Sequence, residues 1–334
     1  MSVIKDVELG GKSIRFEFNK FAKQANGSVM VTCGDTQVLV TACGSSEPKP
    51  GQSFFPLTVD YIEKFYAVGR IPGGFVKRET RPSEREALTS RVIDRPLRPS
   101  FPKGYMNETQ IIATVVSADL ENHPATLALM GASTALMVSN IPFNGPVAAV
   151  RVGMKDGSFI IDPKEEDLVE LDLNIAANPD AVLMVEASAN FLTESQMIEA
   201  IDFAHNAMKP IFEMQLEIQK EIGKAKFEAP QETLDSDLWN RVQEFAKPLL
   251  TDAFGVRDKI QRNQALKKIE SQLLVDLKDE NNPDISTKLV SYFEKLKYET
   301  VRTMILDEKV RIDGRSFDDI RPISCETGLL RRTH

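Results

Sequence analysis

Apolar and polar residues alternate along much of the first 200 residues, with the period of two that is typical of half-buried β-strands. The clearest example is Lys12–Phe18, in which every second side chain is apolar. Two β-branched runs, Val29–Thr32 and Gln37–Ala42, flank Gly34-Asp35, and this order predicts a hairpin. Thr109–Ser117 is apolar on both faces, which predicts a strand inside a sheet. The same signals predict further strands at Leu57–Ile62, Val147–Gly153, Ser158–Ile161, Leu171–Ala176 and Ala181–Glu186.

Helices are predicted between these strands. Pro124–Val138 opens with a proline, which is favoured in the first helical turn, and the small residues around Gly131 would let another element approach closely. Thr193–Gln196 has the spacing of a capping box and predicts the start of a second helix. Pro210 is expected to interrupt that helix, and Gly223 to end the helical pattern that resumes after it.

Composition divides the chain into domains. Residues 1–226 interleave strand and helix signals, which predicts an α+β or α/β domain. Residues 230–309 contain a single glycine and predict a small all-helical domain. Breaks between its helices are expected near Pro248, Gly255 and Asn282-Pro283. Its apolar stripe is expected to be core and consists of Leu238, Val242, Phe245, Leu249, Leu266, Ile269, Leu273, Leu277, Leu289, Phe293 and Leu296.

The last segment, residues 310–334, differs again. Asp313-Gly314 predicts a turn, and Arg321–Cys325 predicts the opening of a strand. A segment this short cannot bury a core of its own. We therefore expect either that it docks on the first domain or that it begins a further sheet domain.

Charge is distributed unevenly. The chain has a net charge of −8, and its 42% hydrophobic content is that of an ordinary folded protein, which excludes disorder as its main state. Glu63–Lys103 nevertheless carries ten basic residues against five acidic ones. A basic segment on an acidic body is a candidate site for a polyanion. A solvated helix with alternating charges explains the same residues, because Glu84–Glu86 mixes both signs.

The cysteines and histidines exclude several classes of protein. Cys33, Cys43 and Cys325 form an odd, scattered set, which argues against a disulfide framework and for a reducing compartment such as the cytoplasm. The three histidines are too far apart in the sequence to form a zinc site by local spacing. We expect no membrane span, because apolar runs are too short, and no signal peptide, because the first ten residues lack an apolar core.

The most informative stretch is Gly69–Pro99. A glycine- and proline-rich hinge presents an aromatic residue and several cations, and a helix is expected to begin near Pro82, where its N-terminus would add N–H donors for phosphate. An exposed aromatic ring can stack on a base, worth about 1–3 kcal/mol, while Lys and Arg neutralise phosphates, so this chemistry suits single-stranded RNA. Four residues are the candidate RNA contacts: Phe75, Lys77, Arg78 and Arg81.

Other patterns give no catalytic assignment. Gly69–Gly74 lacks both the Lys-Ser/Thr of a phosphate-binding loop and the spacing of a dinucleotide-binding motif. Hydrolase elbows and zinc-protease motifs are absent from the sequence. The carboxylates of Glu165–Asp167 are expected to face solvent, and Asp94 is expected to form a structural ion pair with Arg95 or Arg98. We assign no catalytic and no metal-binding residue in this chain.

Eight short motifs follow one another along the chain: Phe54–Tyr61, Gly69–Gly73, Arg81–Glu84, Ile93–Pro99, Ile141–Pro146, Val182–Glu186, Ile312–Arg315 and Arg321–Ile323. In this order they closely resemble the bacterial polynucleotide phosphorylases. The resemblance covers essentially the whole chain, but only about the first half of the family's usual length.

The resemblance implies a fold and an activity. The fold is an RNase PH-like domain (ribosomal protein S5 domain 2-like) at residues 1–226, an all-helical linker domain at 230–309 and the start of a second RNase PH-like domain at 310–334. The activity is 3′-to-5′ phosphorolysis of single-stranded RNA, including mRNA, with release of nucleoside diphosphates. Mg²⁺ and the co-substrate inorganic phosphate act in the second RNase PH-like domain. The chain is therefore expected to be the RNA-channel and assembly half, inactive alone. The family forms homotrimeric rings and can join RNA-degradation complexes.

The family's channel loop usually reads Phe-Phe-Arg-Arg, whereas this chain reads Phe75-Val76-Lys77-Arg78. Arg81 matches a further basic channel position. Replacement of one aromatic residue by Val and of one Arg by Lys is expected to weaken stacking and bidentate phosphate contact. The alternative function is a non-catalytic RNA-binding or ring-assembly module.

Overall fold

The structure is a computed structural model and describes residues 2–49, 52, 54–75, 77–79, 81–168, 170–228, 234–278 and 285–332. The chain folds as two compact units, residues 1–232 and 233–334. None of the helices within these described ranges combines the length and the apolar character needed to cross a bilayer.

The first unit contains a six-stranded sheet, ordered β1-β2-β3-β4-β6-β5, in which only the β5–β6 pair is parallel. Its strands are β1 (Val3–Leu9), β2 (Lys12–Phe18), β3 (Gly27–Cys33), β4 (Thr36–Gly44), β5 (Leu57–Glu63) and β6 (Thr109–Ser117). The predicted hairpin is confirmed, because Cys33 pairs with Thr36 around a turn in which Gly34 has a φ of +57°. The prediction that Thr109–Ser117 lies inside a sheet is also confirmed, since β6 has a neighbour on each side.

Strand β1 was not predicted from the sequence. Its inward-facing positions include Lys5, which forms an ion pair of 2.9 Å with Glu221, while Ile4 faces outward and is exposed. These two residues break the alternation that marks a half-buried strand.

A second, antiparallel sheet of four strands follows, ordered β10-β9-β7-β8. Its strands are β7 (Ala148–Lys155), β8 (Ser158–Ile161), β9 (Leu171–Ala177) and β10 (Val182–Ala189). Three short 3₁₀ turns connect elements of the unit: η1 (Phe65–Val68), η2 (Arg98–Ser100) and η3 (Glu165–Asp167). The predicted strands of this region are all present, with ends displaced by a few residues.

Helix α2 (Pro124–Val138) contacts strands of both sheets. Every residue from Leu127 to Val138 is buried, as expected for a helix that is apolar on all sides. The close approach predicted at Gly131 is confirmed, because a Cβ atom there would lie 2.7 Å from Cγ2 of Val40 and 3.0 Å from Cγ2 of Val31.

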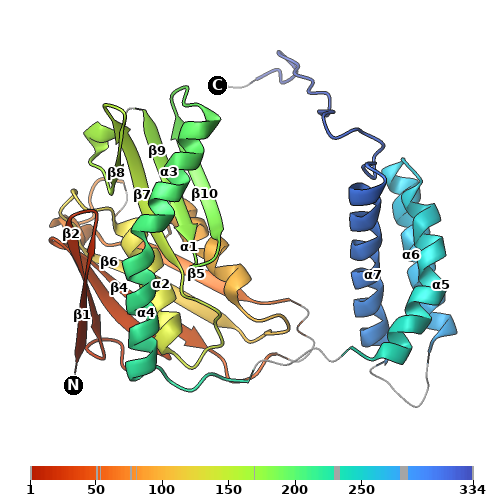
Figure 1. Cartoon of the computed structure of the whole chain (residues 1–334), viewed down its shortest axis with the longest axis horizontal. Helices are drawn as coiled ribbons and strands as arrows, with labels where there is room; N and C mark the ends of the chain where they lie inside the picture. Colours follow the sequence, from red (N-terminus) through yellow and green to blue (C-terminus); the bar gives the residue numbers. More distant parts are fainter. Residues whose placement is uncertain are drawn as a thin grey trace. The chain divides into compact units, whose positions relative to one another are not determined.

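Three more helices complete the first unit: α1 (Glu84–Leu97), α3 (Glu194–Ala207) and α4 (Lys209–Ile222) (Figure 1). The predicted capping box of α3 is confirmed, with Gln196 N–H donating to Thr193 Oγ1 at 3.3 Å and Thr193 N–H to Gln196 Oε1 at 2.9 Å. Pro210 lies in the first turn of α4, where a proline is tolerated, so the helical pattern breaks just before it.

The second unit consists of three helices side by side (Figure 1): α5 (Ser236–Phe254), α6 (Lys259–Asp276) and α7 (Ile285–Asp307). The break expected at Gly255 is confirmed, and Asn282-Pro283 lies outside the described residues. The break expected at Pro248 is wrong, because α5 continues through it. Pro248 is on the exposed side of α5, where water can bind the carbonyl that the missing N–H leaves unpaired.

The core of the second unit differs from the predicted stripe in α5. Ala246 and Leu250 are buried, whereas Phe245 is half-buried and Leu249 is exposed. The buried positions therefore repeat every four residues, and the bulkier neighbours flank the core instead of filling it. The stripe in α7 is as predicted, with Leu289, Phe293 and Leu296 buried in one cluster together with Leu238, Val242, Ile269 and Leu273.

The chain after α7 makes turns. The predicted turn at Asp313-Gly314 is confirmed, with a φ of +77° at Gly314. The buried Arg262 donates from Nη1 to the carbonyl oxygens of Ile312 (3.0 Å) and Val256 (2.9 Å). The strand expected at Arg321–Cys325 is wrong, because these residues pair with no strand of the described chain. The assignment of residues 310–334 to a further domain stays a prediction.

Candidate nucleic-acid interface

The four candidate RNA contacts lie on the surface loop between η1 and α1. Phe75 is fully exposed, and Lys77, Arg78 and Arg81 are exposed as well. Val76 lies outside the described residues. The ion pairs that the structure describes between residues 63 and 103 involve other cations, namely Lys64, Arg85, Arg95 and Arg98. The loop therefore presents an aromatic ring and three cations to solvent, which is what stacking on bases and contact with phosphates require.

The helix after the loop begins close to the expected position but does not supply phosphate donors. Ser83 is its N-cap, and Ser83 Oγ accepts the Glu86 N–H at 3.2 Å, while Glu86 Oε2 accepts the Ser83 N–H at 2.6 Å. Glu84 and Glu86 place two carboxylates in the first turn. The expectation of an anion site at this N-terminus is therefore wrong, because a capping box and negative charge occupy it.

Other cations of the stretch are structural. Arg98 donates to both carboxylate oxygens of Asp94 (2.8 and 3.1 Å) and to the Leu57 carbonyl (3.1 Å). The predicted structural ion pair of Asp94 is thus confirmed, with Arg98 as its partner. The carboxylates of η3 were expected to face solvent, but Asp167 forms an ion pair with Lys155, which lowers the pKa of Asp167.

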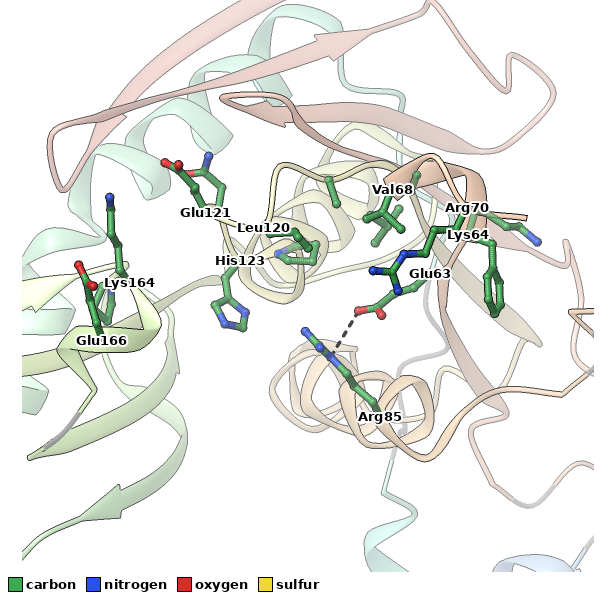
Figure 2. Close-up of a pocket in the computed structure, with 17 residues that line it drawn as sticks. Glu63, Lys64, Val68, Arg70, Arg85, Leu120, Glu121, His123, Lys164 and Glu166 are labelled. Carbon is green, nitrogen blue, oxygen red and sulfur yellow. Dashed lines mark ion pairs between the residues drawn. The ribbon is translucent and has the colours of Figure 1, made fainter. Parts of the chain in front are cut away.

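A cleft of about 770 Å³ adjoins the loop and was missed by sequence reasoning (Figure 2). The cleft is lined by Lys64 before η1, Arg70 in the first part of the loop, Arg85 of α1, His123 at the start of α2, and Lys164 before η3. Figure 2 shows the side chains of Arg85 and His123 pointing into this space. The lining residues come from parts of the chain up to 100 residues apart, so no local motif reveals them.

Two ion pairs lie in or near the cleft. Arg85 Nε lies 3.5 Å from Glu63 Oε1, which also accepts the Tyr61 hydroxyl at 2.8 Å. The nearly buried Arg151 holds Asp172 in a two-pronged pair of 2.7 and 2.8 Å and also contacts His123. Hydrogen bonds from Arg151 lower the pKa of Asp172. Burial raises the pKa of Tyr61.

Asp119 fixes the loop that leads into α2. Its Oδ1 accepts the Thr36 hydroxyl (2.8 Å) and the N–H groups of Glu121 and Asn122 (both 2.9 Å). Its Oδ2 accepts the Asp35 N–H (3.0 Å) and the Asn122 side-chain amide (2.7 Å). Burial opposes ionisation of Asp119, but these hydrogen bonds outweigh it and hold its pKa well below the ordinary range.

Within the described part of the chain, no three His, Cys, Asp or Glu side chains gather closely enough to hold a metal ion. The site is therefore best described as an exposed cationic loop with one aromatic ring, next to a cleft in which Arg85 pairs with Glu63.

Three family descriptions match successive parts of the chain. Residues 10–142 match the 3′ exoribonuclease family, domain 1, and residues 145–207 match domain 2 of the same family. Residues 237–316 match the RNA binding domain of polyribonucleotide nucleotidyltransferase. The exoribonuclease matches lie in the first compact unit and the third lies in the second unit.

Curated relatives agree with these matches. Polyribonucleotide nucleotidyltransferase 1 of Alkaliphilus metalliredigens is 49% identical over 332 residues, which cover 98% of this chain and 47% of the relative. The polyribonucleotide nucleotidyltransferase of Pelobacter propionicus is 46% identical over 336 residues, which cover 100% of this chain and 48% of the relative. The chain thus spans about half the length of the curated relatives it matches.

Among solved structures, rice (Oryza sativa) Rrp46 is similar, with a TM-score of 0.51 and 16% identity over 65% of this chain and 97% of that chain. A likeness at this identity supports the fold alone, and the fold agrees with the expected α+β, RNase PH-like architecture followed by helices. The chain therefore belongs to the 3′ exoribonuclease family, and it is similar over its whole length to the N-terminal half of polyribonucleotide nucleotidyltransferases.

Proposed function

We propose that this chain is the RNA-channel and assembly half of a polyribonucleotide nucleotidyltransferase. The complete enzyme uses inorganic phosphate to attack the 3′-terminal phosphodiester of single-stranded RNA and releases nucleoside diphosphates one after another. In this proposal the residues that break the bond lie outside this chain. The observation that carries it is the exposed cationic loop, in a chain similar to half of these enzymes.

The loop acts by two physical effects. The exposed ring of Phe75 stacks on a base, and Lys77, Arg78 and Arg81 neutralise backbone phosphates. Lys at position 77 supplies a point charge and not the two-pronged fork of an Arg, so it attracts phosphate without fixing its orientation. The loop therefore guides a strand of any sequence, which suits an enzyme that shortens RNA step by step.

The proposal includes partners and conditions. Three copies form a ring through which single-stranded RNA passes, the enzyme works in the cytoplasm, and RNA-degradation complexes are possible partners. Mg²⁺ assists the full-length enzyme by neutralising charge that develops on the phosphoryl oxygens. The described residues of this chain offer no cluster of ligands that fits the ion, so we derive no step through it here.

The first test measures RNA binding and its salt dependence. Lys77→Ala combined with Arg78→Ala removes two phosphate contacts, so the slope of log affinity against log salt flattens by about 1.4, at roughly 0.7 per phosphate for single strands. The matched control is Lys209→Ala with Lys220→Ala, which removes the same charge from exposed positions on α4. An unchanged slope in the loop variant refutes the proposed contacts.

The second test separates stacking from charge. Phe75→Ala is expected to weaken binding of an oligo(A) single strand by about 1–3 kcal/mol and to affect duplex RNA much less, because bases in a duplex are already stacked. Equal losses on both forms of RNA contradict a stacking role for Phe75.

A second candidate function is a non-catalytic RNA-binding or ring-assembly module. It is favoured by the match of residues 237–316 to a domain described as RNA binding. Both functions predict that this chain alone does not release nucleoside diphosphate from poly(A) in the presence of phosphate, and robust turnover would refute the claim that its catalytic residues lie elsewhere. The size of the particle in solution distinguishes a trimer from a monomer.

A further inference from the structure

The free edge of the first sheet is capped by side chains from the end of the loop between η1 and α1 and from helix α1 itself. Strand β5 is the last strand of its sheet, and it pairs with β6 along one edge only. Just past β5, the N–H of Lys64 still points inward and donates to the Val115 carbonyl of β6 at 3.4 Å. Backbone N–H groups alternate in direction along a strand, so the odd-numbered neighbours point away from the sheet.

Three of these outward N–H groups, those of Tyr61, Glu63 and Phe65, have side-chain acceptors. Tyr61 N–H donates to the hydroxyl of Ser90 at 2.9 Å, and Glu63 N–H donates to a carboxylate oxygen of Glu86 at 2.8 Å. Both acceptors are on α1, which begins after the loop. These two contacts fasten the helix to the strand and close an edge that would otherwise be unpaired.

The third acceptor is on the loop itself. Glu79 Oε1 accepts the N–H of Phe65 at 2.8 Å, and its Oε2 accepts Nζ of Lys64 at 3.0 Å. Both partners precede the loop in sequence, whereas Glu79 follows Lys77 and Arg78 directly. Both contacts lie at the surface, although the Lys64 and Glu79 side chains are each less than one-third exposed. The Phe65 N–H is the main cause of a lowered pKa for Glu79.

We propose that Glu79 is a positioning residue for RNA binding, because it fastens the second arm of the loop to the first and thereby sets the direction of Lys77, Arg78 and Phe75. This inference rests on the proposed RNA contacts of the loop. Elsewhere in the described part of the loop, Ile71 and Phe75 are at least nine-tenths exposed. Pre-organisation of such a loop reduces the conformational entropy that RNA binding would otherwise cost.

The alternative is a purely electrostatic role for Glu79, which predicts the opposite change in RNA affinity when Glu79 is replaced. Glu79 is a negative charge next to two cations, so its removal alone strengthens the attraction of the loop for phosphate. If Glu79 positions the loop, Glu79→Ala weakens binding of oligo(A) about three- to tenfold despite the gain of positive charge. Glu79→Gln keeps an oxygen for the Phe65 N–H and is expected to retain part of the affinity.

The test combines RNA affinity with amide hydrogen exchange of the RNA-free protein, in the wild type, Glu79→Ala, Glu79→Gln and the control Glu84→Gln. The control removes the same charge from the first turn of α1, where Glu84 is exposed. Faster exchange at Phe65 and Arg70 together with weaker RNA binding, in Glu79→Ala but not in Glu84→Gln, is the expected result.

Two results overturn the inference. Unchanged exchange in Glu79→Ala shows that the carboxylate does not hold the loop, and RNA affinity equal to or above that of the wild type shows that it does not serve binding. Lys77→Ala with Arg78→Ala, measured in parallel, separates this failure from failure of the proposed function: normal RNA binding by that double variant refutes the contacts themselves.

Discussion

Asp119 is expected to be the polar side chain on which the first unit depends most strongly. It accepts five hydrogen bonds and so joins the β3–β4 turn to the start of α2. Two of its donors are on buried side chains, because Thr36 is fully buried and Asn122 is 9% exposed. Each buried donor that loses its partner costs about 1–3 kcal/mol. Asp119→Ala is therefore expected to lower the free energy of unfolding by about 2–5 kcal/mol. The exposed donors add little to this loss, because water can replace the carboxylate as their acceptor.

Asp119→Asn is a sharper test because it preserves shape. Both carboxylate oxygens accept at least two hydrogen bonds, so whichever way the introduced side-chain amide is turned, its NH₂ group faces donors. We expect a loss of about 1–3 kcal/mol. Asp35→Asn, in the same turn but exposed, is the matched control and should change stability by less than about 0.5 kcal/mol.

The assay is urea unfolding followed by circular dichroism. The chain's one tryptophan, Trp239, lies in the second unit, so its fluorescence provides a separate signal for that unit in the same sample. A loss below about 0.5 kcal/mol for both Asp119 variants would refute the reasoning. Since the pKa of Asp119 is depressed in the folded protein, its ionised form contributes fully to the free energy of unfolding above the ordinary Asp pKa of about 3.9. That contribution is lost as the pH falls through the pKa of Asp119 in the folded protein. The difference between wild type and Asp119→Asn should thus be equal at pH 7 and pH 5 and shrink only in stronger acid.

Two further predictions concern the ends and the middle of α2. Gly131→Ala gains about 1 kcal/mol of helix propensity, but it places a Cβ atom 2.7 Å from Val40. Because such overpacking costs about 1–3 kcal/mol, the melting temperature is expected to fall. An unchanged or raised melting temperature contradicts the tight packing around this glycine. Lys226 donates to the carbonyls of Leu136, Met137 and Ser139 at the C-terminal end of α2, and burial lowers the pKa of Lys226 to about 8. The folded protein therefore binds fewer protons than the unfolded chain between about pH 8 and 10.5. Because of this difference, Lys226 makes the free energy of unfolding rise with pH in that window. Urea titrations of Lys226→Met, run in parallel with the wild type, should not show that rise.

Much of the fold follows from local patterns. Alternation, β-branched runs and residues apolar on both faces located nine of the ten strands in the described residues. Caps and prolines located α2, α3 and the interruption before α4 within a few residues. The exceptions have local causes. β1 carries Lys5 on its inner face, and α5 passes through Pro248 because that residue is exposed. The turn at Gly34 depends on residues adjacent in sequence, and the small residues around Gly131 indicated a close approach although its partners, Val31 and Val40, lie far away in the sequence.

The candidate site was only partly predictable. The exposed loop could be recognised, since Phe75, Lys77 and Arg78 lie together in sequence between glycines and prolines. Glu79 and Glu86 contributed only their charges to that interpretation, although their carboxylates bind backbone N–H groups 14 and 23 residues away. Ser83 and Glu86 have the spacing of a capping box, and this signal could have shown that the start of α1 is not free to bind phosphate. The cleft depends on residues brought together by the fold, and no pattern in the sequence marks it.

The occupied edge of β5 also limits how copies of this protein can aggregate. A flat, unpaired strand edge can bind further strands by main-chain hydrogen bonding, which leads to aggregates that grow without limit. Here the outward amides of Tyr61, Glu63 and Phe65 are already bonded to side chains, two of them carboxylates. An incoming strand would have to displace these three hydrogen bonds, two of them part-buried, and approach negative charge. Association on this flank must therefore proceed through side-chain surfaces and not through the addition of strands.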